Sequence, residues 1–249
     1  MTRTARFVSL LLAASAGGCS DGPVHAPLST LGASIAQDPA ASRSRYNVFA
    51  CTTCHAVHAA EAAGRVLPGA PLEGAANRSS YWGGETVFLR EAVSRCWVGF
   101  MRGTPTDLDG PTGDALSAWL VSLGTDAGTA AATVPATWPR TITDPGPGDA
   151  AAGQAVWTRA CQSCHGSFGT GARRLGTIVS VLPNDTVQTH CSDTVPAGYA
   201  DRNAYIRTIA AEKIRHGSFL GYAGTMPPFS VETLSDAQVR DLAAMFRCP

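Results

Sequence analysis

The sequence is poor in lysine and has no excess of charge of either sign. Its 249 residues include 19 lysines and arginines and 19 aspartates and glutamates, so the formal net charge is zero. Lys213 is the only lysine. This balance argues against a basic surface of the kind that attracts nucleic acid, so we expect no nucleic-acid partner and no strong electrostatic steering. Docking to other proteins would then depend on shape and apolar surface.

Long hydrophobic runs are also lacking. The apolar run at residues 7–14 follows Arg3 and Arg6, is too short to span a bilayer, and ends in small residues. This pattern predicts a secretory signal peptide over residues 1–19. No other segment is predicted to cross a membrane.

The end of this segment resembles a bacterial lipobox. Ala16-Gly17-Gly18-Cys19 would be cleaved before Cys19, whose sulfur would then be acylated, although Ala16 stands where the motif usually has leucine. The alternative is ordinary signal cleavage nearby, with Cys19 discarded or left free. We expect an exported protein held by lipid on the periplasmic side of a bacterial membrane.

One five-residue pattern, Cys-x-x-Cys-His, occurs twice, and it is the attachment signature of c-type haem. Two thiols three residues apart on one helical turn can add to both vinyl groups of one porphyrin, and the adjoining imidazole then reaches the iron. A single copy could be a zinc or dithiol-redox site, but zinc needs four ligands and dithiol chemistry does not need the histidine. Two copies predict two covalently bound haem c groups. Their binding residues are Cys51, Cys54, His55, Cys161, Cys164 and His165.

Composition divides the chain into two similar halves. Residues 20–37 are small, polar and proline-containing, which predicts a flexible, disordered tether. A stretch rich in proline and glycine predicts a domain linker over residues 125–148. Each half carries a Cys-x-x-Cys-His motif near its start and a short amphipathic helix at its end. The sequence therefore predicts an all-α fold of two tandem haem domains, residues 38–124 and 149–249.

The second half has the clearer helix signals. A helix is expected over residues 149–160, leading into the haem motif. Ser235 and Gln238 form a capping box at the start of the last helix. Helical spacing would let Phe246 cross the first helix at the small residue Gly153.

The order of these features resembles a class I cytochrome c domain over residues 149–249. The resemblance rests on the helix, the haem motif and the segment Gly224-Thr225-Met226-Pro227-Pro228-Phe229 before the last helix. In that family the methionine of such a segment is the second axial ligand, and its thioether raises the haem potential. The resemblance implies that Met226 ligates the second iron. His190 and His216 are alternatives without a ligand motif around them.

Cys191 and Cys248 are the spare thiols of the second half. An oxidising compartment favours a disulfide between them, which would tie a mid-domain loop to the C-terminal tail. The alternative is two separate free thiols, which exported proteins seldom keep exposed.

Cys96 is the cysteine left over in the first half. It lies in the segment 92–103, which precedes an expected amphipathic helix over residues 112–123. Residues 38–124 resemble thiosulfate dehydrogenases and the cytochromes of the Sox sulfur-oxidation system. In those families a cysteine in this segment ligates iron as thiolate or persulfide. The resemblance implies that Cys96 faces His55 across the first haem.

Two alternatives for Cys96 stay open. Met101 could be the ligand instead, which would give two similar His/Met haems and a plain electron carrier. Cys96 could also form a disulfide or be an inert buried thiol. A thiolate ligand would lower the first haem's potential below that of the second, so electrons would leave through the second domain.

Two functions are compatible with these patterns. The favoured one is a diheme electron carrier between a donor protein and an acceptor protein. The alternative is an oxidoreductase that acts on thiosulfate or a related sulfur oxyanion at a Cys-ligated first haem, for which cationic residues would have to line that haem. The candidates by position are Arg65, Arg78, Arg90, Arg95 and Arg102. The carrier is favoured because the second half resembles an ordinary electron-transfer cytochrome.

Overall fold

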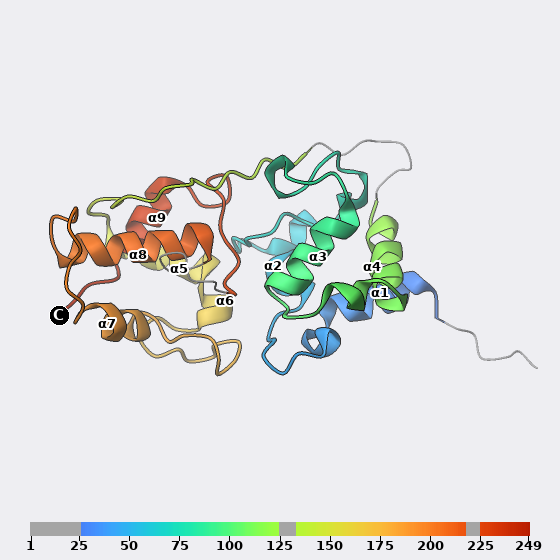
Figure 1. The fold of residues 1–249 in the computed structure, drawn as a ribbon, viewed down its shortest axis with the longest axis horizontal. Helices are drawn as coiled ribbons and strands as arrows, with labels where there is room; N and C mark the ends of the chain where they lie inside the picture. Colours follow the sequence, from blue (N-terminus) through green and yellow to red (C-terminus); the bar gives the residue numbers. More distant parts are fainter. Residues whose placement is uncertain (1–25, 125–132, 218–224) are drawn as a thin grey trace, which may run out of the picture.

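The computed structural model describes residues 26–124, 133–217 and 225–249. Within these ranges the chain is helical and has no strand, apart from one isolated bridge between Tyr81 and Thr86. The prediction of an all-α fold is confirmed. The helices form two groups that lie side by side along the long axis of the molecule, α1 to α4 in one and α5 to α9 in the other (Figure 1).

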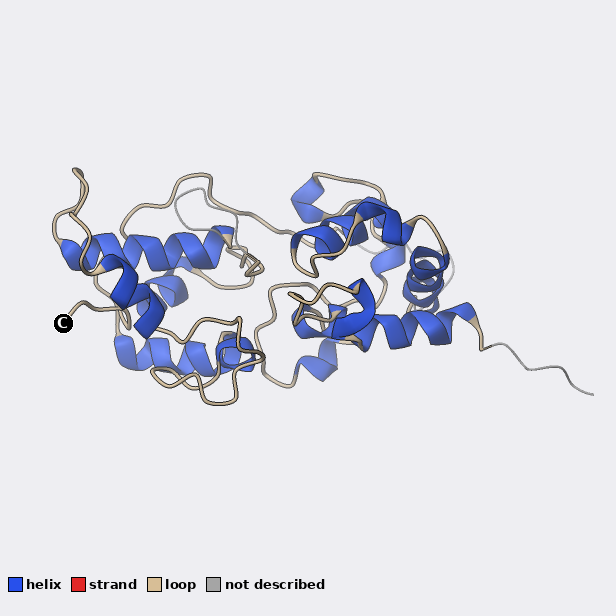
Figure 2. Ribbon diagram, turned by 60° about the horizontal axis from the view of Figure 1, so that its bottom comes forward, coloured by secondary structure: helices blue, strands red, loops and turns tan. Residues whose placement is uncertain are grey.

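In the described residues the first group consists of four helices and five short 3-10 turns. Loops connect them (Figure 2). The helices are α1 (Leu28–Gln37), α2 (Cys51–Cys54), α3 (Leu89–Gly99) and α4 (Pro111–Ser122). The 3-10 turns are Pro39–Ser42, Ala59–Ala62, Ala75–Asn77, Trp82–Gly84 and Pro105–Leu108. The amphipathic helix expected over residues 112–123 is α4, displaced by one residue.

Helix α1 corrects the prediction of a disordered tether over residues 20–37. Gly32 and Ala36 are buried against α4, and a Cβ placed on Gly32 would lie 2.0 Å from the carbonyl oxygen of Ala115. The small residues that made this segment look like a tether let two helices approach closely. The composition of this segment would not by itself stabilise a helix. Packing against α4 supplies the stabilisation. Cys19 and the signal peptide lie outside the described residues.

The second group consists of five helices. They are α5 (Ala150–Ala160), α6 (Gln162–His165), α7 (Asn184–His190), α8 (Arg202–His216) and α9 (Asp236–Ala243). The helix expected before the second haem motif is α5, capped by Asp149, and the capping box of Ser235 and Gln238 at the start of α9 is confirmed.

Helices α5 and α9 pack against each other at Gly153, but the prediction of Phe246 as the opposite residue is wrong. A Cβ on Gly153 would lie 2.2 Å from the carbonyl oxygen of Asp241 and 3.1 Å from Cγ of Met245. Because α9 ends at Ala243, Phe246 leaves the helical register. Its ring packs edge-on against Phe168 instead, with centroids 5.8 Å apart.

Cys191 and Cys248 form a disulfide with a Cα–Cα distance of 5.5 Å, as predicted. It closes a separation of 57 residues and ties the loop after α7 to the C-terminal tail. Among the residues that the structure describes, no helix is long and apolar enough to cross a membrane.

Residues 133–148 of the expected linker run along both helix groups (Figure 1). Thr133 shares hydrogen bonds with Ser79 and Ser80 of the first group. Thr137 donates its amide and its hydroxyl to Glu232 of the second group, over 2.8 and 2.7 Å. The linker is therefore attached to both groups. Residues 125–132 lie outside the described part of the chain.

Candidate haem sites

The two Cys-x-x-Cys-His motifs lie close together where the helix groups meet. Each motif forms a helical turn, α2 for the first and α6 for the second, and the two turns approach each other in Figure 1. Cys164 packs against the apolar core of the first group, and the amide of Val66 donates to the carbonyl of Arg159 over 2.9 Å. The raised pKa of the Cys54 thiol follows from burial first and from the nearby Cys164 second.

Both motif histidines are held in the same way. His55 Nδ1 lies 2.7 Å from the carbonyl oxygen of Ala70, and His165 Nδ1 lies 3.1 Å from that of Ser180, each partner being 15 residues further along the chain. A carbonyl oxygen can only accept a hydrogen bond, so Nδ1 carries the hydrogen and Nε2 keeps a free lone pair. That tautomer is the one that binds iron through Nε2. Burial lowers the pKa of both imidazoles, which favours the neutral ligand form.

Backbone contacts fix the segments that carry these carbonyls. The amide of Gly69 donates to Cys54 over 3.0 Å, and the amide of Leu175 donates to Cys164 over 2.8 Å. A Cβ on Gly69 would lie 2.2 Å from Cε1 of His55, so only glycine allows this close approach. Each motif is thus hydrogen-bonded to the loop that follows it.

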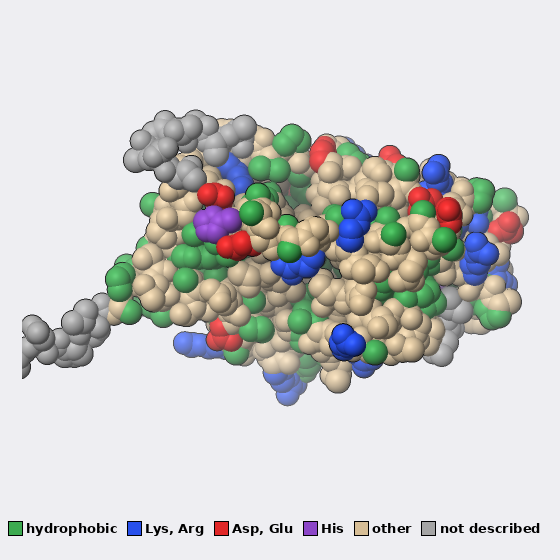
Figure 3. Space-filling view, turned by 180° about the vertical axis from the view of Figure 1, so that it is seen from behind, with side chains coloured by type: hydrophobic (Ala, Val, Ile, Leu, Met, Phe, Trp, Pro, Cys, Tyr) green, Lys and Arg blue, Asp and Glu red, His purple; other side chains and the backbone are tan. Residues whose placement is uncertain are grey.

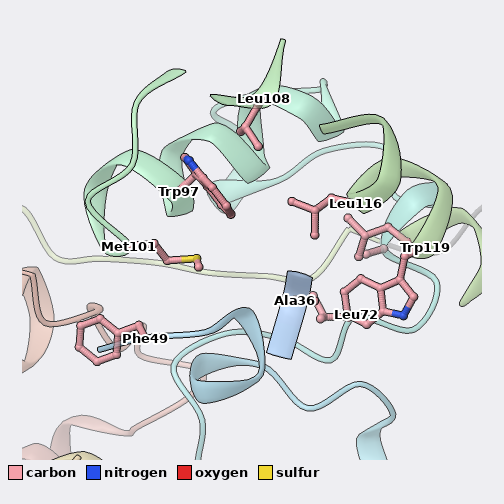
Figure 4. Close-up of a cluster of buried hydrophobic side chains, with 10 residues drawn as sticks. Ala36, Phe49, Leu72, Trp97, Met101, Leu108, Leu116 and Trp119 are labelled. Atoms are coloured by element: carbon pink, nitrogen blue, oxygen red, sulfur yellow. The ribbon is translucent and has the colours of Figure 1, made fainter. Parts of the chain in front are cut away.

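The first motif opens onto a cavity of about 520 Å³. This volume falls in the range of ~300–1,000 Å³ that small-molecule and cofactor sites occupy. Its lining is mostly apolar, and Met101 and Trp97 point into the same interior space in Figure 4. The cavity also contains Cys51, Cys54 and His55. The residues fit a covalently bound haem, because two thiols, an oriented imidazole and an apolar wall converge on one space.

Helix α3 forms the wall on which the candidate sixth ligand lies. Its positions Leu89, Val93 and Cys96 and the C-cap residue Phe100 recur at helical spacing, and all four line the cavity. Burial raises the pKa of the Cys96 thiol to about 12, and the neighbouring Cys51 adds to the effect. Cys96 forms no disulfide, so that alternative does not hold.

Met101 lines the same cavity from the segment just after α3. Its side chain is 3% exposed and belongs to the apolar core cluster with Trp97 and Leu116. The structure therefore brings both rival ligands, Cys96 and Met101, into the space that His55 borders.

The second motif borders a smaller cavity of about 130 Å³, a quarter of the volume of the first. Its lining includes Cys161, Cys164, His165 and Met226. The fit of a haem here rests on this donor set rather than on the enclosed volume.

Helix α8 positions the segment that carries Met226. The amide of Phe229 donates to Ile214 over 2.9 Å, and the buried guanidinium of Arg215 donates to the carbonyls of Phe229 and Ser230. Gly217 ends α8 with φ of 70°, and a Cβ there would lie 2.1 Å from the carbonyl oxygen of Met226. The methionine is therefore held by its flanking backbone.

The two cavities share part of their walls. Phe49, Cys54, Leu67, Pro68 and Pro227 line both of them. In the space-filling view a hollow lies between the two halves, and charges of both signs are scattered over this face (Figure 3). The two sites are neighbours rather than distant pockets.

Most of the other candidate arginines and histidines do not line the cavities. Of the five candidate arginines only Arg78 is among the lining residues of the first cavity. Arg95 pairs with Glu85 and Glu91. His190 pairs with Asp193, His216 contacts the carbonyl of Pro139, and neither is among the described lining of either cavity.

Sequence reasoning missed several residues of the sites. Gly69 and Ala70 carried no motif, although a glycine in the loop after a haem motif is a weak sign of close packing. No sequence motif predicts that Pro227 or the linker residue Trp138 lines the first cavity. Their contributions depend on the approach of segments that are distant in sequence.

Comparison with known proteins bears on the second half. Residues 148–244 match the family model described as cytochrome c oxidase, cbb3-type, subunit III. Residues 148–244 form a cytochrome c domain. Such a domain binds haem c covalently and transfers electrons. This cytochrome c domain contains helices α5 to α9 and the second haem motif.

No curated protein matches the chain significantly. The solved structure of thiosulfate dehydrogenase (TsdBA) from Marichromatium purpuratum, in its as-isolated form, aligns with a TM-score of 0.42 and 20% sequence identity. The alignment covers 93% of this chain and 48% of that one, so this chain spans about half the length of that structure.

Proposed function

We propose that this chain is an exported diheme c-type cytochrome that passes electrons between redox proteins through two covalently bound haems. One observation carries the proposal: each Cys-x-x-Cys-His turn borders a cavity that also contains a sulfur donor from a different element. Cys96 and Met101 supply it in the first cavity, and Met226 in the second. Bound haem iron would supply the one-electron chemistry.

The chain's own residues have distinct roles in this proposal. Cys51 and Cys54 hold the first haem, and the matching pair Cys161 and Cys164 holds the second. His55 and His165 present Nε2 to iron because Ala70 and Ser180 bind their other nitrogens. The apolar walls exclude water from the iron, and the shared wall keeps the path between the haems short.

Export and lipid attachment at Cys19 complete the proposal. They are supported by the apolar run after Arg3 and Arg6 and by the two haem motifs, because bacteria attach haem c after export. A periplasmic location on the membrane surface would place the protein beside membrane-bound redox partners.

Cys96 is the sixth ligand that we propose for the first haem. It lies in the middle of the cavity-lining face of α3, whereas Met101 is packed into the apolar core beside Trp97. The high pKa of the free thiol does not oppose ligation, since a metal ion deprotonates a coordinating thiol outright. Thiolate donation would set the first haem at the lower potential.

Electron paramagnetic resonance of the ferric, haem-loaded protein tests this ligand. Thiolate-ligated low-spin iron has a narrower spread of g values than His/Met iron. We expect a narrow signal in the native protein that disappears in Cys96→Ser and persists in Met101→Leu. A native spectrum without the narrow signal, in which one His/Met signal is lost in Met101→Leu, would make Met101 the ligand. Intact mass, which counts haems per chain, tests the diheme proposal separately.

A second candidate function is oxidation of thiosulfate or a related sulfur oxyanion at the first haem. It is favoured by one half-buried thiol outside the haem motifs, Cys96, and one guanidinium, Arg78, which line the same cavity. Millimolar thiosulfate should then reduce the haems of the native protein and fail to reduce those of Cys96→Ser. An unchanged ferric spectrum in the native protein would leave the electron carrier as the function.

A further inference from the structure

The first helix group supplies part of the wall of the second cavity. That cavity contains the second haem motif and Met226, but several of its described lining residues come from much earlier in the chain. They are Val48, Phe49, Thr53, Cys54, Leu67 and Pro68. All six lie outside residues 148–244, which form the cytochrome c domain. The second site is therefore not complete within the domain that carries its histidine.

Leu67 and Pro68 belong to a segment that is fixed to the second group. The preceding residue, Val66, packs against the apolar core of that group. Its amide donates to the carbonyl of Arg159 over 2.9 Å, in the last turn of α5 before the second haem motif. Because Leu67 and Pro68 line both cavities, this segment forms a partition between the two sites.

Val48 reaches the second site from a different segment. It lies three residues before Cys51 and packs against the core of the first group, yet it lines the second cavity and is not among the described lining of the first. A Cβ on Gly176 would lie 2.8 Å from Cγ1 of Val48. Gly176 belongs to the loop whose Ser180 carbonyl orients His165. Val48 is therefore in close contact with the loop that holds the second histidine.

The attachment side of the second motif also faces the first group. Cys164 packs against the apolar core of the first group, and its motif partner Cys161 is buried. A haem bonded to Cys164 would turn that edge toward the first group and away from water. The first group thus covers an edge of the second haem as well as one wall of its cavity.

We propose that Val48, Leu67 and Pro68 of the first helix group are binding residues for the second haem and raise its potential by excluding water. This inference rests on the haem that the proposed function assigns to the second motif. Ferric haem carries one more positive charge than ferrous haem, so an apolar wall disfavours the ferric form and raises the potential. The solvent exclusion provided by the first group adds to the effect of the Met226 thioether.

A redox titration of the haem-loaded protein, followed by the EPR signals of the ferric haems, tests the proposal in Val48→Thr. Threonine keeps the shape of valine and adds a hydroxyl. Val57→Thr is the matched control, because Val57 also packs against the first core but is not among the described lining of either cavity. The signal that Met226→Ala alters identifies the second haem. We expect its midpoint potential to fall in Val48→Thr and to stay unchanged in Val57→Thr, with the first haem unaffected by both.

Leu67→Asn gives a different pattern, because Leu67 lines both cavities. We expect the midpoint potentials of both haems to fall in this variant. If Val48→Thr does not fold, Val48→Ala takes its place, since it opens the same wall without adding a polar group and should also lower the potential of the second haem alone.

The native potential of the second haem in the Val48 variant, or an equal fall in Val57→Thr, would overturn the proposal. A fall confined to the first haem in Leu67→Asn would overturn it as well. Intact mass reports independently whether the second haem is attached. A native chain without that haem would reject the proposed function, whereas two attached haems with unchanged potentials in the variants would reject only this inference.

Discussion

At the scale of single residues, backbone hydrogen bonds orient both motif imidazoles for metal binding. His55 and His165 each donate Nδ1–H to a backbone carbonyl. Both carbonyls belong to loops that also hydrogen-bond, through a backbone amide, to the second cysteine of the motif. The protein thereby fixes the tautomer and the ring direction through the backbone. Side-chain substitutions elsewhere would disturb these contacts less than a change in the loops themselves.

Gly69→Ala tests this arrangement. The new Cβ would lie 2.2 Å from Cε1 of His55, so the ring must move away from its present position. We expect the first haem to lose its low-spin histidine spectrum while the second is unchanged, measured by magnetic circular dichroism. Gly99→Ala is the control, because a Cβ there meets nothing within 4 Å. An unaltered spectrum in Gly69→Ala would show that His55 is not held through this loop.

At the scale of elements, the second site depends on helices that do not contain its ligands. Helix α8 holds the Met226 segment through Arg215, and α9 packs on α5, which leads directly into the haem motif. Asp201 caps the start of α8 with a 2.7 Å bond to the amide of Ala204, and basic residues in its last turn complement the helix dipole. The ligands of the second site are therefore positioned by helices that are stabilised by their own caps and packing contacts.

Gly153→Ala tests the packing of α5 on α9. A Cβ would lie 2.2 Å from the carbonyl oxygen of Asp241, and backbone cannot yield as a flexible side chain can. We expect the free energy of unfolding to fall by about 1–3 kcal/mol, the usual cost of overpacking, measured by urea denaturation. Gln154→Ala, at an exposed position of α5, should change it by less than about 0.5 kcal/mol. Equal effects of the two changes would contradict the close crossing.

At the scale of the whole molecule, the two helix groups are joined by a linker that is bonded to both. The pKa of Glu232 is lowered from 4.5 to about 2, because the Thr137 hydroxyl and amide donate to its carboxylate. A carboxylate whose pKa is lower in the folded than in the unfolded state stabilises the fold at pH values above its unfolded-state pKa. That stabilisation is lost as the pH falls through its folded-state pKa.

Glu232→Gln should therefore remove a pH-dependent part of the stability. We expect the native protein to be more stable than the variant above pH 4.5 and the difference to shrink as the pH falls toward about 2. Urea denaturation at several pH values measures this. Thr137→Val, which loses the 2.7 Å hydroxyl bond but keeps the amide bond, should give an intermediate effect. Parallel pH profiles for the native protein and Glu232→Gln would contradict the role of this contact.

The sequence by itself determined what depends on local chemistry and short spacing. The haem motifs, the capping box at Ser235, the helix that begins after Asp149 and the pairing of Cys191 with Cys248 could all be predicted in this way. Each follows from residues that are neighbours in the chain or from the reactivity of thiols in an oxidising compartment.

Only the tertiary structure decided which distant segments meet. The small residues of 28–37 look like a tether until α4 covers them, and the contact of Gly153 with Asp241 instead of Phe246 depends on where α9 ends. The approach of Gly69 to His55 and the shared wall at Pro227 are likewise not encoded in any local pattern. The physical reason is that close packing rewards complementary shape between segments far apart in sequence, and composition does not report shape.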